Sequence, residues 1–350
     1  MWILSLLMFI IILGVIILVH EFGHFITAKK SGVHIYEFSI GMGPVIFSHK
    51  GKDKIMYNIR AFPIGGFVQM AGEVYEDDKK VKKKEFLCNR PWYQRLMILV
   101  AGVFNNFLLA IVLLFILALI WGPANYTSKL ANVDYGSAAY NAGIRAGDTI
   151  TAINGHNFTS WDVGQIYLYY KNPSNIYTFA ITHEDGSKSL IELSPDIVTN
   201  EKGEETKVFG IQIEVKNEKG FFKSIQYAFE KFVHIMQSMA LTIGGLITGK
   251  ISIKNLSGPV GIYQVVDQSV KLGIQQIIYL TAYLSINVGF INILPFPAFD
   301  GGHVLFMILE KIFGKKMNAK IESIATMIGF ALLMLLMLVI TIQDIGKLFL

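Results

Sequence analysis

The residues best suited to chemistry are His20, Glu21 and His24, within the sequence His-Glu-Phe-Gly-His. Two histidines four positions apart lie on one face of a helix, so both imidazoles can bind one metal ion. The glutamate between them would lie beside that ion and act as a general base toward water bound to it. Zinc also needs a third protein ligand and an open position for water, so another side chain must come from elsewhere in the chain.

This motif ends an apolar run. Residues Trp2–Val19 are interrupted only by Ser5 and Gly14, and a run of about 18 apolar residues is long enough to span a bilayer. No basic residue precedes the run and no small-x-small cleavage site follows it, so we interpret it as a retained helix rather than a secretory signal. The predicted metal site therefore lies at the edge of a membrane or inside it.

The composition agrees with a membrane protein. The 350 residues are 53% hydrophobic and have a mean hydropathy of +0.47, which is too apolar for an ordinary soluble chain. The net charge of +5 is modest, and in membrane proteins basic residues report topology more often than nucleic-acid binding. We expect no nucleic-acid partner. The single cysteine, Cys88, excludes an internal disulfide and gives no support to a cysteine-based metal site.

Four stretches are apolar enough to cross a bilayer, and we expect transmembrane helices in segments 1–30, 95–121, 274–303 and 324–350. Residues 25–95, which connect the apolar runs of the first two spans, carry 13 Lys and Arg residues, and the predicted loop 304–323 carries four lysines. The positive-inside rule places both loops in the cytoplasm. Both chain ends and the long segment between the second and third spans then lie on the extracytoplasmic side.

The third metal ligand is expected at the end of the third span. Pro295 and Pro297 break the helix before Asp300, and irregular backbone at membrane depth is tolerated only where it lines protein or a cavity. A carboxylate in such apolar surroundings is a functional-site candidate and a normal zinc ligand. The first and third spans run in the same direction, so Asp300 reaches the depth of the histidine pair. His303 is the alternative ligand.

Segment 31–94 is expected to form a β-hairpin or membrane-reentrant region and a charged loop on the cytoplasmic side. Residues 33–40 and 55–61 are rich in β-branched and aromatic side chains and are bounded by glycines and prolines. An edge strand here would pair with an extended substrate backbone. The alternative, a structural hairpin that only closes the membrane face, stays open. The basic run 82–84 suits contact with anionic lipid.

The second span carries Gly102 and Asn106, four residues apart on one face. A small residue and an amide in a span usually serve helix packing. Asn105 and Asn106 would need hydrogen-bond partners if lipid surrounded them, so one of the two is expected to face the cavity of the site.

The extracytoplasmic part is predicted to contain two segments. Within 126–215, residues 136–155 pass from a small-residue helix through a Gly-Asp turn into a strand that ends at an Asn-Gly turn, which resembles the core of a PDZ domain. A PDZ domain binds peptides by strand addition; the alternative is a PDZ-shaped spacer that excludes bulky partners. Segment 216–273 has helical spacing with interrupting charges and is expected to form amphipathic helices at the outer membrane surface.

Taken together, the motif at 20–24, Phe-Pro-Ile-Gly-Gly-Phe-Val at 62–68, Asn-Ile-Leu-Pro-Phe-Pro-Ala-Phe-Asp-Gly-Gly-His at 292–303 and the PDZ-like insert resemble the site-2 protease family. The nearest resemblance is to its regulator-of-sigma-E-protease type, and it covers almost the whole chain. It implies an α-helical polytopic protein with four transmembrane helices, a membrane-associated β-hairpin region and one extracytoplasmic PDZ (α+β) domain. The expected location is the plasma (inner) membrane of a bacterium.

The resemblance implies an intramembrane zinc metalloprotease that acts in regulated intramembrane proteolysis. Zn²⁺ would be bound by His20, His24 and Asp300 near the cytoplasmic side, with Glu21 as the catalytic base. The substrates would be single-span membrane proteins, namely anti-sigma factors or remnant signal peptides, already trimmed by another protease. The PDZ domain would filter them by size or sequence. The candidate substrate-binding residues are Asn292, where the family has a substrate-binding asparagine, and Gly65, Gly66, Phe67 and Asn106.

The chain departs from the family in two places. Phe299 stands where the family usually has leucine before Asp-Gly, which is a hydrophobic exchange. The sigma-E protease proper carries two PDZ domains, whereas this chain has room for one.

Two functions of other classes remain open. A non-proteolytic membrane chaperone or binding protein would keep the metal for structure, but a purely structural site does not need Glu21. A metal or ion transporter would use His and Asp residues in its spans, but it would leave the PDZ-like segment and the glycine-rich hairpin unexplained. The sequence predicts no oligomeric state.

Overall fold

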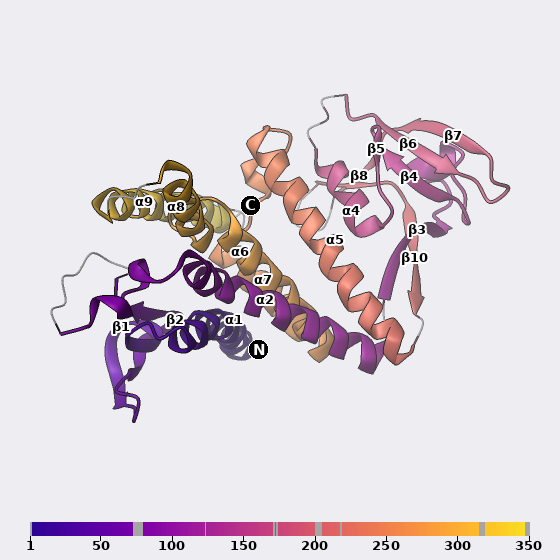
Figure 1. The fold of residues 1–350 in the computed structure, drawn as a ribbon. Helices are drawn as coiled ribbons and strands as arrows, with labels where there is room; N and C mark the ends of the chain where they lie inside the picture. The colour runs from indigo at the N-terminus through magenta and orange to yellow at the C-terminus, as the bar shows by residue number, and fades with distance from the viewer. Residues whose placement is uncertain are drawn as a thin grey trace. The chain divides into compact units, whose positions relative to one another are not determined.

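The computed structural model describes residues 2–72, 80–122, 124–170, 172, 174–199, 205–217, 219–314 and 319–346, and Figure 1 shows the path of the chain. The chain divides into two compact units, Met1–Leu113 with Gly258–Thr341, and Leu114–Ser257 with Ile342–Leu350. Three parts of the predicted organisation lie outside the described residues: positions 73–79 of the charged stretch expected at 73–85, the lysines at 315 and 316, and the end of the fourth span at 347–350.

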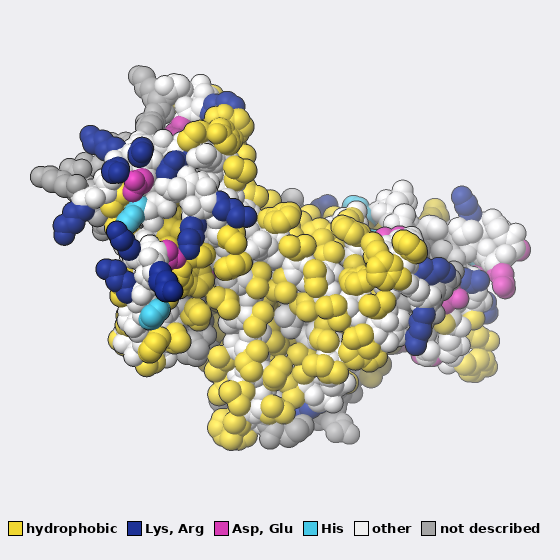
Figure 2. Space-filling view, turned by 60° about the horizontal axis from the view of Figure 1, so that its bottom comes forward, with side chains coloured by type: hydrophobic (Ala, Val, Ile, Leu, Met, Phe, Trp, Pro, Cys, Tyr) yellow, Lys and Arg dark blue, Asp and Glu magenta, His cyan; other side chains and the backbone are white. Residues whose placement is uncertain are grey.

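The first unit is mainly helical. Its helices are α1 (Trp2–Lys30), α2 (Trp92–Trp121), α6 (Pro259–Leu272), α7 (Ile274–Ile293), α8 (Asp300–Phe313) and α9 (Ala319–Gly346), of which α2 and α9 continue into the second unit. Among the described residues, α1, α2, α7 and α9 are long and apolar enough to cross a membrane. Hydrophobic side chains cover a broad continuous surface (Figure 2). These helices confirm the predicted polytopic membrane protein.

Two helix boundaries differ from the sequence prediction. Helix α2 begins at Trp92, three residues before the expected start. The chain after α7 is helical again from Asp300 to Phe313, although 304–323 was expected to be a loop. The reason is that Pro295 and Pro297 end one helix but do not prevent a new one from starting three residues later.

A sheet of two long, bent strands lies beside α1 in the first unit, as the sequence predicts. Strands β1 (Ile35–Lys50) and β2 (Met56–Met70) are antiparallel and pair twice. Ser39 lies opposite Asn58 on one side and opposite Phe67 on the other. The first half of β1 is therefore an inner strand, and residues 66–69 of β2 form an outer strand that pairs on one side only within the described part of the chain.

The bends of this sheet require glycine. Gly41, Gly43 and Gly65 have φ angles of +86°, +85° and +92°, a region that side chains with a β-carbon rarely adopt. The short helices η1 (Lys83–Glu85) and η2 (Leu87–Asn89) precede α2. A core that includes Phe25, Phe38, Val68 and Leu87 joins α1, the sheet and η2.

Helices α1 and α2 cross at glycines. A β-carbon at Gly23 would overlap the carbonyl oxygen of Ala101 and lie 2.9 Å from the backbone nitrogen of Gly102. Small residues permit such close backbone contact between membrane helices. At the other end of α1, Ser5 Oγ donates a 2.6 Å hydrogen bond to Asp267 Oδ1 of α6.

Two polar pairs hold α8. Arg95 of α2 donates a 2.6 Å hydrogen bond to Glu310 Oε2, and both side chains are largely buried. His303 Nδ1 lies 2.9 Å from Glu322 Oε1 of α9. Partly buried charge pairs of this kind fix the orientation of the elements that carry them. Helix α8, whose first residue is Asp300, is therefore tied to α2 through Glu310 and to α9 through His303.

The second unit contains an antiparallel sheet in the order β10-β3-β4-β6-β7. Its strands are β3 (Ala124–Val133), β4 (Thr149–Ile153), β6 (Tyr177–Thr182), β7 (Lys188–Leu193) and β10 (Ile211–Asn217); β5 (His156–Asn157) pairs with β4, and β8 (Asp196–Thr199) pairs with β9 (Glu205–Val208). Its helices are α3 (Ala138–Asn141), α4 (Trp161–Gly164), η3 (Gln165–Tyr169), α5 (Phe221–Ile247) and η4 (Ile253–Asn255). The core includes Ile150, Ile153, Tyr177 and Phe179.

Helix α5 is tied to α4 by a buried charge pair. Lys231 is only 3% exposed, and its Nζ donates hydrogen bonds of 2.8 and 2.7 Å to the two carboxylate oxygens of Asp162. Ser238 Oγ donates a further 2.9 Å hydrogen bond to the carbonyl of Asp162. A paired and hydrogen-bonded charge is the form in which a buried lysine is tolerated. These contacts connect α5 with the sheet-containing part of its unit.

The glycine crossing yields the first prediction. Replacing Gly23 with alanine lowers the stability of the protein by about 1–3 kcal/mol, because the new β-carbon overlaps the Ala101 carbonyl. Gly14→Ala is the matched control in the same helix, since a β-carbon there meets no atom within 4 Å. The measurement is the apparent melting temperature of both variants in the same detergent. Equal melting temperatures for the two variants would contradict the close crossing.

Candidate metal centre

Three side chains that could together bind a metal ion converge in the first unit. His20 and His24 lie one turn apart on α1 and are each 7% exposed, and Asp300 is the first residue of α8. The two Nε2 atoms are 3.2 Å apart, and Asp300 Oδ2 lies 3.2 Å from Nε2 of His20 and 3.3 Å from Nε2 of His24. The structure thus brings together, as one potential metal-binding group, the three residues that the sequence singled out.

The distances between these atoms fit zinc. Tetrahedral ligands at about 2.0–2.1 Å from a zinc ion lie about 3.3 Å from one another, which matches the three measured separations. Asp300 Oδ2 is buried and makes no hydrogen bond with any residue that the structure describes. Two imidazole nitrogens and a carboxylate oxygen are also a donor set that zinc prefers.

The tautomer of His24 is set by the backbone of α2. His24 Nδ1 lies 2.8 Å from the carbonyl oxygen of Ile98. A carbonyl oxygen only accepts hydrogen bonds, so Nδ1 carries the proton, and in the neutral ring the lone pair is on Nε2. The nitrogen that points toward Asp300 is therefore the one able to bind a metal.

Gly102 makes room for the two rings. A β-carbon at this position would lie 2.8 Å from His20 Cε1 and would overlap Nε2 of His24. The sequence indicates only a packing role for Gly102. In the structure, the absence of a side chain at Gly102 also leaves the space that the two imidazole rings occupy. In the sequence, Gly102 and Asn106 share one face of the second span, which indicates a packing surface. The sequence does not reveal that the helix with the two histidines packs against this face.

Glu21 lies between the histidine pair and the sheet. A β-carbon at Gly66 would lie 3.4 Å from Glu21 Cγ and 2.9 Å from the carbonyl oxygen of Ser39. Gly66 therefore allows the outer strand to approach the glutamate while it pairs with β1. The candidate base Glu21 is therefore next to the outer strand formed by residues 66–69 of β2.

Phe67 and Gly65 shape this strand. The Phe67 ring is 5.0 Å from the guanidinium of Arg60, which forms an ion pair with Glu37. Burial alone would raise the pKa of Glu37, but hydrogen bonds from Ser39 and Arg60 outweigh it and lower the pKa below its ordinary value. Glu37 thus stays ionised and ties β1 to the first half of β2 through Arg60. Gly65 provides the bend before the strand.

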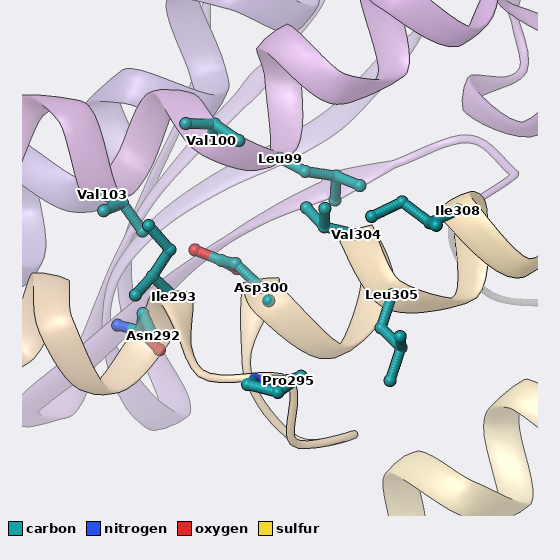
Figure 3. A pocket seen from close by; sticks show the side chains of 11 residues that line it. Leu99, Val100, Val103, Asn292, Ile293, Pro295, Asp300, Val304, Leu305 and Ile308 are labelled. Carbon is teal, nitrogen blue, oxygen red and sulfur yellow. The ribbon is translucent and has the colours of Figure 1, made fainter.

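Asn292 and Asp300 line one pocket of about 290 Å³ (Figure 3). The remaining wall is aliphatic and comes from α2 and from the α7–α8 region, including Val103, Ile293 and Val304. The structure therefore places the predicted asparagine at an apolar pocket that adjoins the candidate metal centre.

The two amides of α2 both find partners on α1. Asn105 Nδ2 donates a 3.2 Å hydrogen bond to the Val19 carbonyl. Asn106 is fully buried, and its Nδ2 lies 3.3 Å from His20 Nδ1. The alternative ligand His303 is not a member of the metal-binding group; it lies beside Glu322 of α9.

Comparison with known proteins adds an independent finding. Residues 8–336 match the family described as Peptidase family M50. The chain is 32% identical to "Regulator of sigma-W protease RasP" of Bacillus subtilis, with 100% of both chains covered. It is 34% identical to "Zinc metalloprotease RasP" of Bacillus licheniformis, with 98% of this chain and 99% of the relative covered. The same identity is found with "Zinc metalloprotease RasP" of Shouchella clausii, with 99% of each covered.

The ligand geometry yields a prediction about metal content. Asp300→Ala reduces the zinc of the purified protein from one ion per chain to nearly none, because two histidines alone leave the zinc ligand set incomplete. His303→Ala, a change in the same helix, keeps its zinc. Elemental analysis after dialysis measures both. Full zinc content in the Asp300 variant would exclude Asp300 as a ligand.

Proposed function

Because the chain belongs to peptidase family M50, the family of site-2 proteases, and is a zinc metalloprotease, we propose that it cuts transmembrane segments of single-span membrane proteins inside the bilayer. The observation that carries this proposal is the proximity of Glu21 to Gly66, where a β-carbon would lie 3.4 Å from Glu21 Cγ, so that the candidate base is near the outer strand within a unit of membrane-length helices. The family match favours a protease over the chaperone and the transporter.

We propose that His20, His24 and Asp300 hold the zinc ion. Their ligand atoms lie 3.2–3.3 Å apart, and Gly102 leaves space for the rings. Zinc bound there supplies a Lewis acid that polarises a peptide carbonyl and lowers the pKa of water. The protein's part is to present neutral imidazoles and an ionised carboxylate with their lone pairs directed to one point.

Glu21 moves the proton in this proposal. Its carboxylate takes a proton from the water whose oxygen bonds to the carbonyl carbon of the substrate. When the C–N bond breaks, Glu21 gives that proton to the leaving amine nitrogen. The carboxylate ends the cycle in its starting state. Its position next to His20 and at the edge of the strand allows it to reach both the water and the extended substrate.

The outer strand would hold the substrate. A transmembrane helix hides its carbonyls in internal hydrogen bonds, so it must be extended locally before it is cut. Residues 66–69 pair with β1 on one side only within the described chain, so an extended segment can add to their other side. Glycine at position 66 lets this strand lie close to Glu21, since a β-carbon there would be 3.4 Å from Glu21 Cγ.

The pocket at Asp300 would take an apolar side chain of the substrate beside the cut bond. Its wall is almost entirely aliphatic, which matches residues of a transmembrane segment. Asn292 brings the one amide of this wall and would hydrogen-bond the substrate backbone.

The remaining parts of the proposal concern location and partners. The basic loops favour a plasma-membrane protein with both ends outside and the metal centre near the cytoplasmic side. The antiparallel sheet of the second unit supports a PDZ-like domain outside the cell that filters substrates. The relative in Bacillus subtilis is named for regulating sigma-W, so we propose anti-sigma factors, and also remnant signal peptides, as the substrate class.

The role of the base can be tested directly. Glu21→Gln lowers the rate of cleavage of a single-span substrate at least ~100-fold, because the amide cannot accept the proton, while the zinc content stays at one ion per chain. Glu192→Gln, an exposed change in the second unit, leaves the rate unchanged. The readout is the yield of cut product in detergent or liposomes. Undiminished cleavage by the Glu21 variant would refute the proposed function.

The pocket yields a prediction about specificity. Val304→Phe fills part of the pocket and lowers cleavage of substrates with leucine or phenylalanine beside the cut bond by roughly 10-fold or more, while substrates with alanine there are spared. Ile312→Phe, on the exposed side of the same helix, is the control. The measurement is the cleavage rate of substrates that differ only at this residue, expressed as the ratio of the leucine or phenylalanine substrate to the alanine substrate. An equal loss for all substrates would contradict the assignment of the pocket.

A further inference from the structure

We infer that Asn106 is a positioning residue that holds the His20 imidazole in its metal-binding tautomer by accepting a hydrogen bond from Nδ1. This inference rests on the zinc ligands proposed above. It replaces the substrate contact that the sequence suggested for Asn106.

The two histidines have different partners at their second ring nitrogen. The Ile98 carbonyl, 2.8 Å from His24 Nδ1, can only accept, so it determines the tautomer of that ring. His20 Nδ1 faces the side-chain amide of Asn106 at 3.3 Å. An amide can either donate or accept, so the tautomer of His20 depends on which end of the amide faces the ring.

The observed orientation leaves a buried group unsatisfied. Nδ2 of Asn106 faces His20, while Oδ1 is buried and makes no hydrogen bond with any described residue. A donor opposite Nδ1 would leave the proton of a neutral ring on Nε2, the atom that lies 3.2 Å from Asp300 Oδ2. That proton would occupy the position where the metal must bind.

A half-turn of the amide removes both problems. The nitrogen and oxygen of an asparagine amide exchange places when its plane turns by 180°. Oδ1 then accepts from His20 Nδ1, which moves the ring proton to Nδ1 and frees the lone pair on Nε2. Metal-binding histidines generally donate their other N–H to an oxygen in this manner. Both histidines would then donate to oxygens supplied by α2.

Asn106 is held where this role requires it. Both Asn106 and Ser285 are 0% exposed. Ser285 Oγ of α7 donates a 2.8 Å hydrogen bond to the backbone carbonyl oxygen of Asn106, so the side-chain amide oxygen stays available to His20. Gly102, one turn earlier on α2, lets the ring approach. Because the residue is fully buried against the ring, it reaches His20 more readily than it reaches a substrate.

The test measures zinc affinity, so it does not depend on proteolysis. In the purified full-length protein in detergent, Asn106→Leu removes the acceptor and weakens zinc binding about 10–100-fold in chelator competition. Asn106→Asp keeps an acceptor at the same place and retains affinity within a few-fold. Asn105→Leu, which removes the neighbouring amide that bonds the Val19 carbonyl, serves as the control and keeps the affinity of the unaltered protein.

Two results would overturn the inference. One is unchanged zinc affinity in Asn106→Leu, and the other is an equal loss in Asn106→Asp, which would indicate packing rather than hydrogen bonding. If the leucine variant does not fold, nitrogen NMR of the zinc-loaded unaltered protein decides: Nδ1 of His20 is expected to be protonated, and an unprotonated Nδ1 contradicts the inference. A protein that passes these tests but cuts no substrate would refute the proposed function alone.

Discussion

The close contact between α1 and α2 at Gly23 and Gly102 is the constraint on which the rest of the structure depends. A side chain at either position would separate the two backbones or displace the imidazole rings. With glycine at both, the rings of His20 and His24 lie against α2, which fixes one ring through a backbone carbonyl. In a bilayer, where lipid tails give no hydrophobic drive for helix association, such close packing is a main source of specificity.

Other elements bring the reacting groups to this crossing. The outer strand of the bent sheet reaches Glu21 because Gly66 has no side chain. On the opposite side, the break after α7 allows α8 to begin at Asp300, and the Arg95–Glu310 pair holds α8 against α2. The site therefore combines a candidate metal-binding group, a candidate base, a strand edge and an apolar pocket, all within one unit of the chain.

The sequence predicted the residues with chemical character better than their surroundings. Spacing on a helix is local, so His20, Glu21 and His24 could be recognised directly. Asp300 required only the direction of the spans and a carboxylate at a broken helix. In contrast, the first half of β1 pairs with both halves of the bent strand β2. This pairing depends on non-local contacts, which leave no periodic pattern in the sequence. The same holds for Asn106, whose partner is 86 positions away.

We propose that zinc is bound by two imidazoles and one carboxylate beside Glu21. X-ray absorption at the zinc edge of the purified, unaltered protein tests it most directly. The account predicts one zinc per chain with two imidazole nitrogens and oxygen ligands at about 2.0–2.1 Å. A spectrum that shows no imidazole, or three imidazoles, would contradict the account.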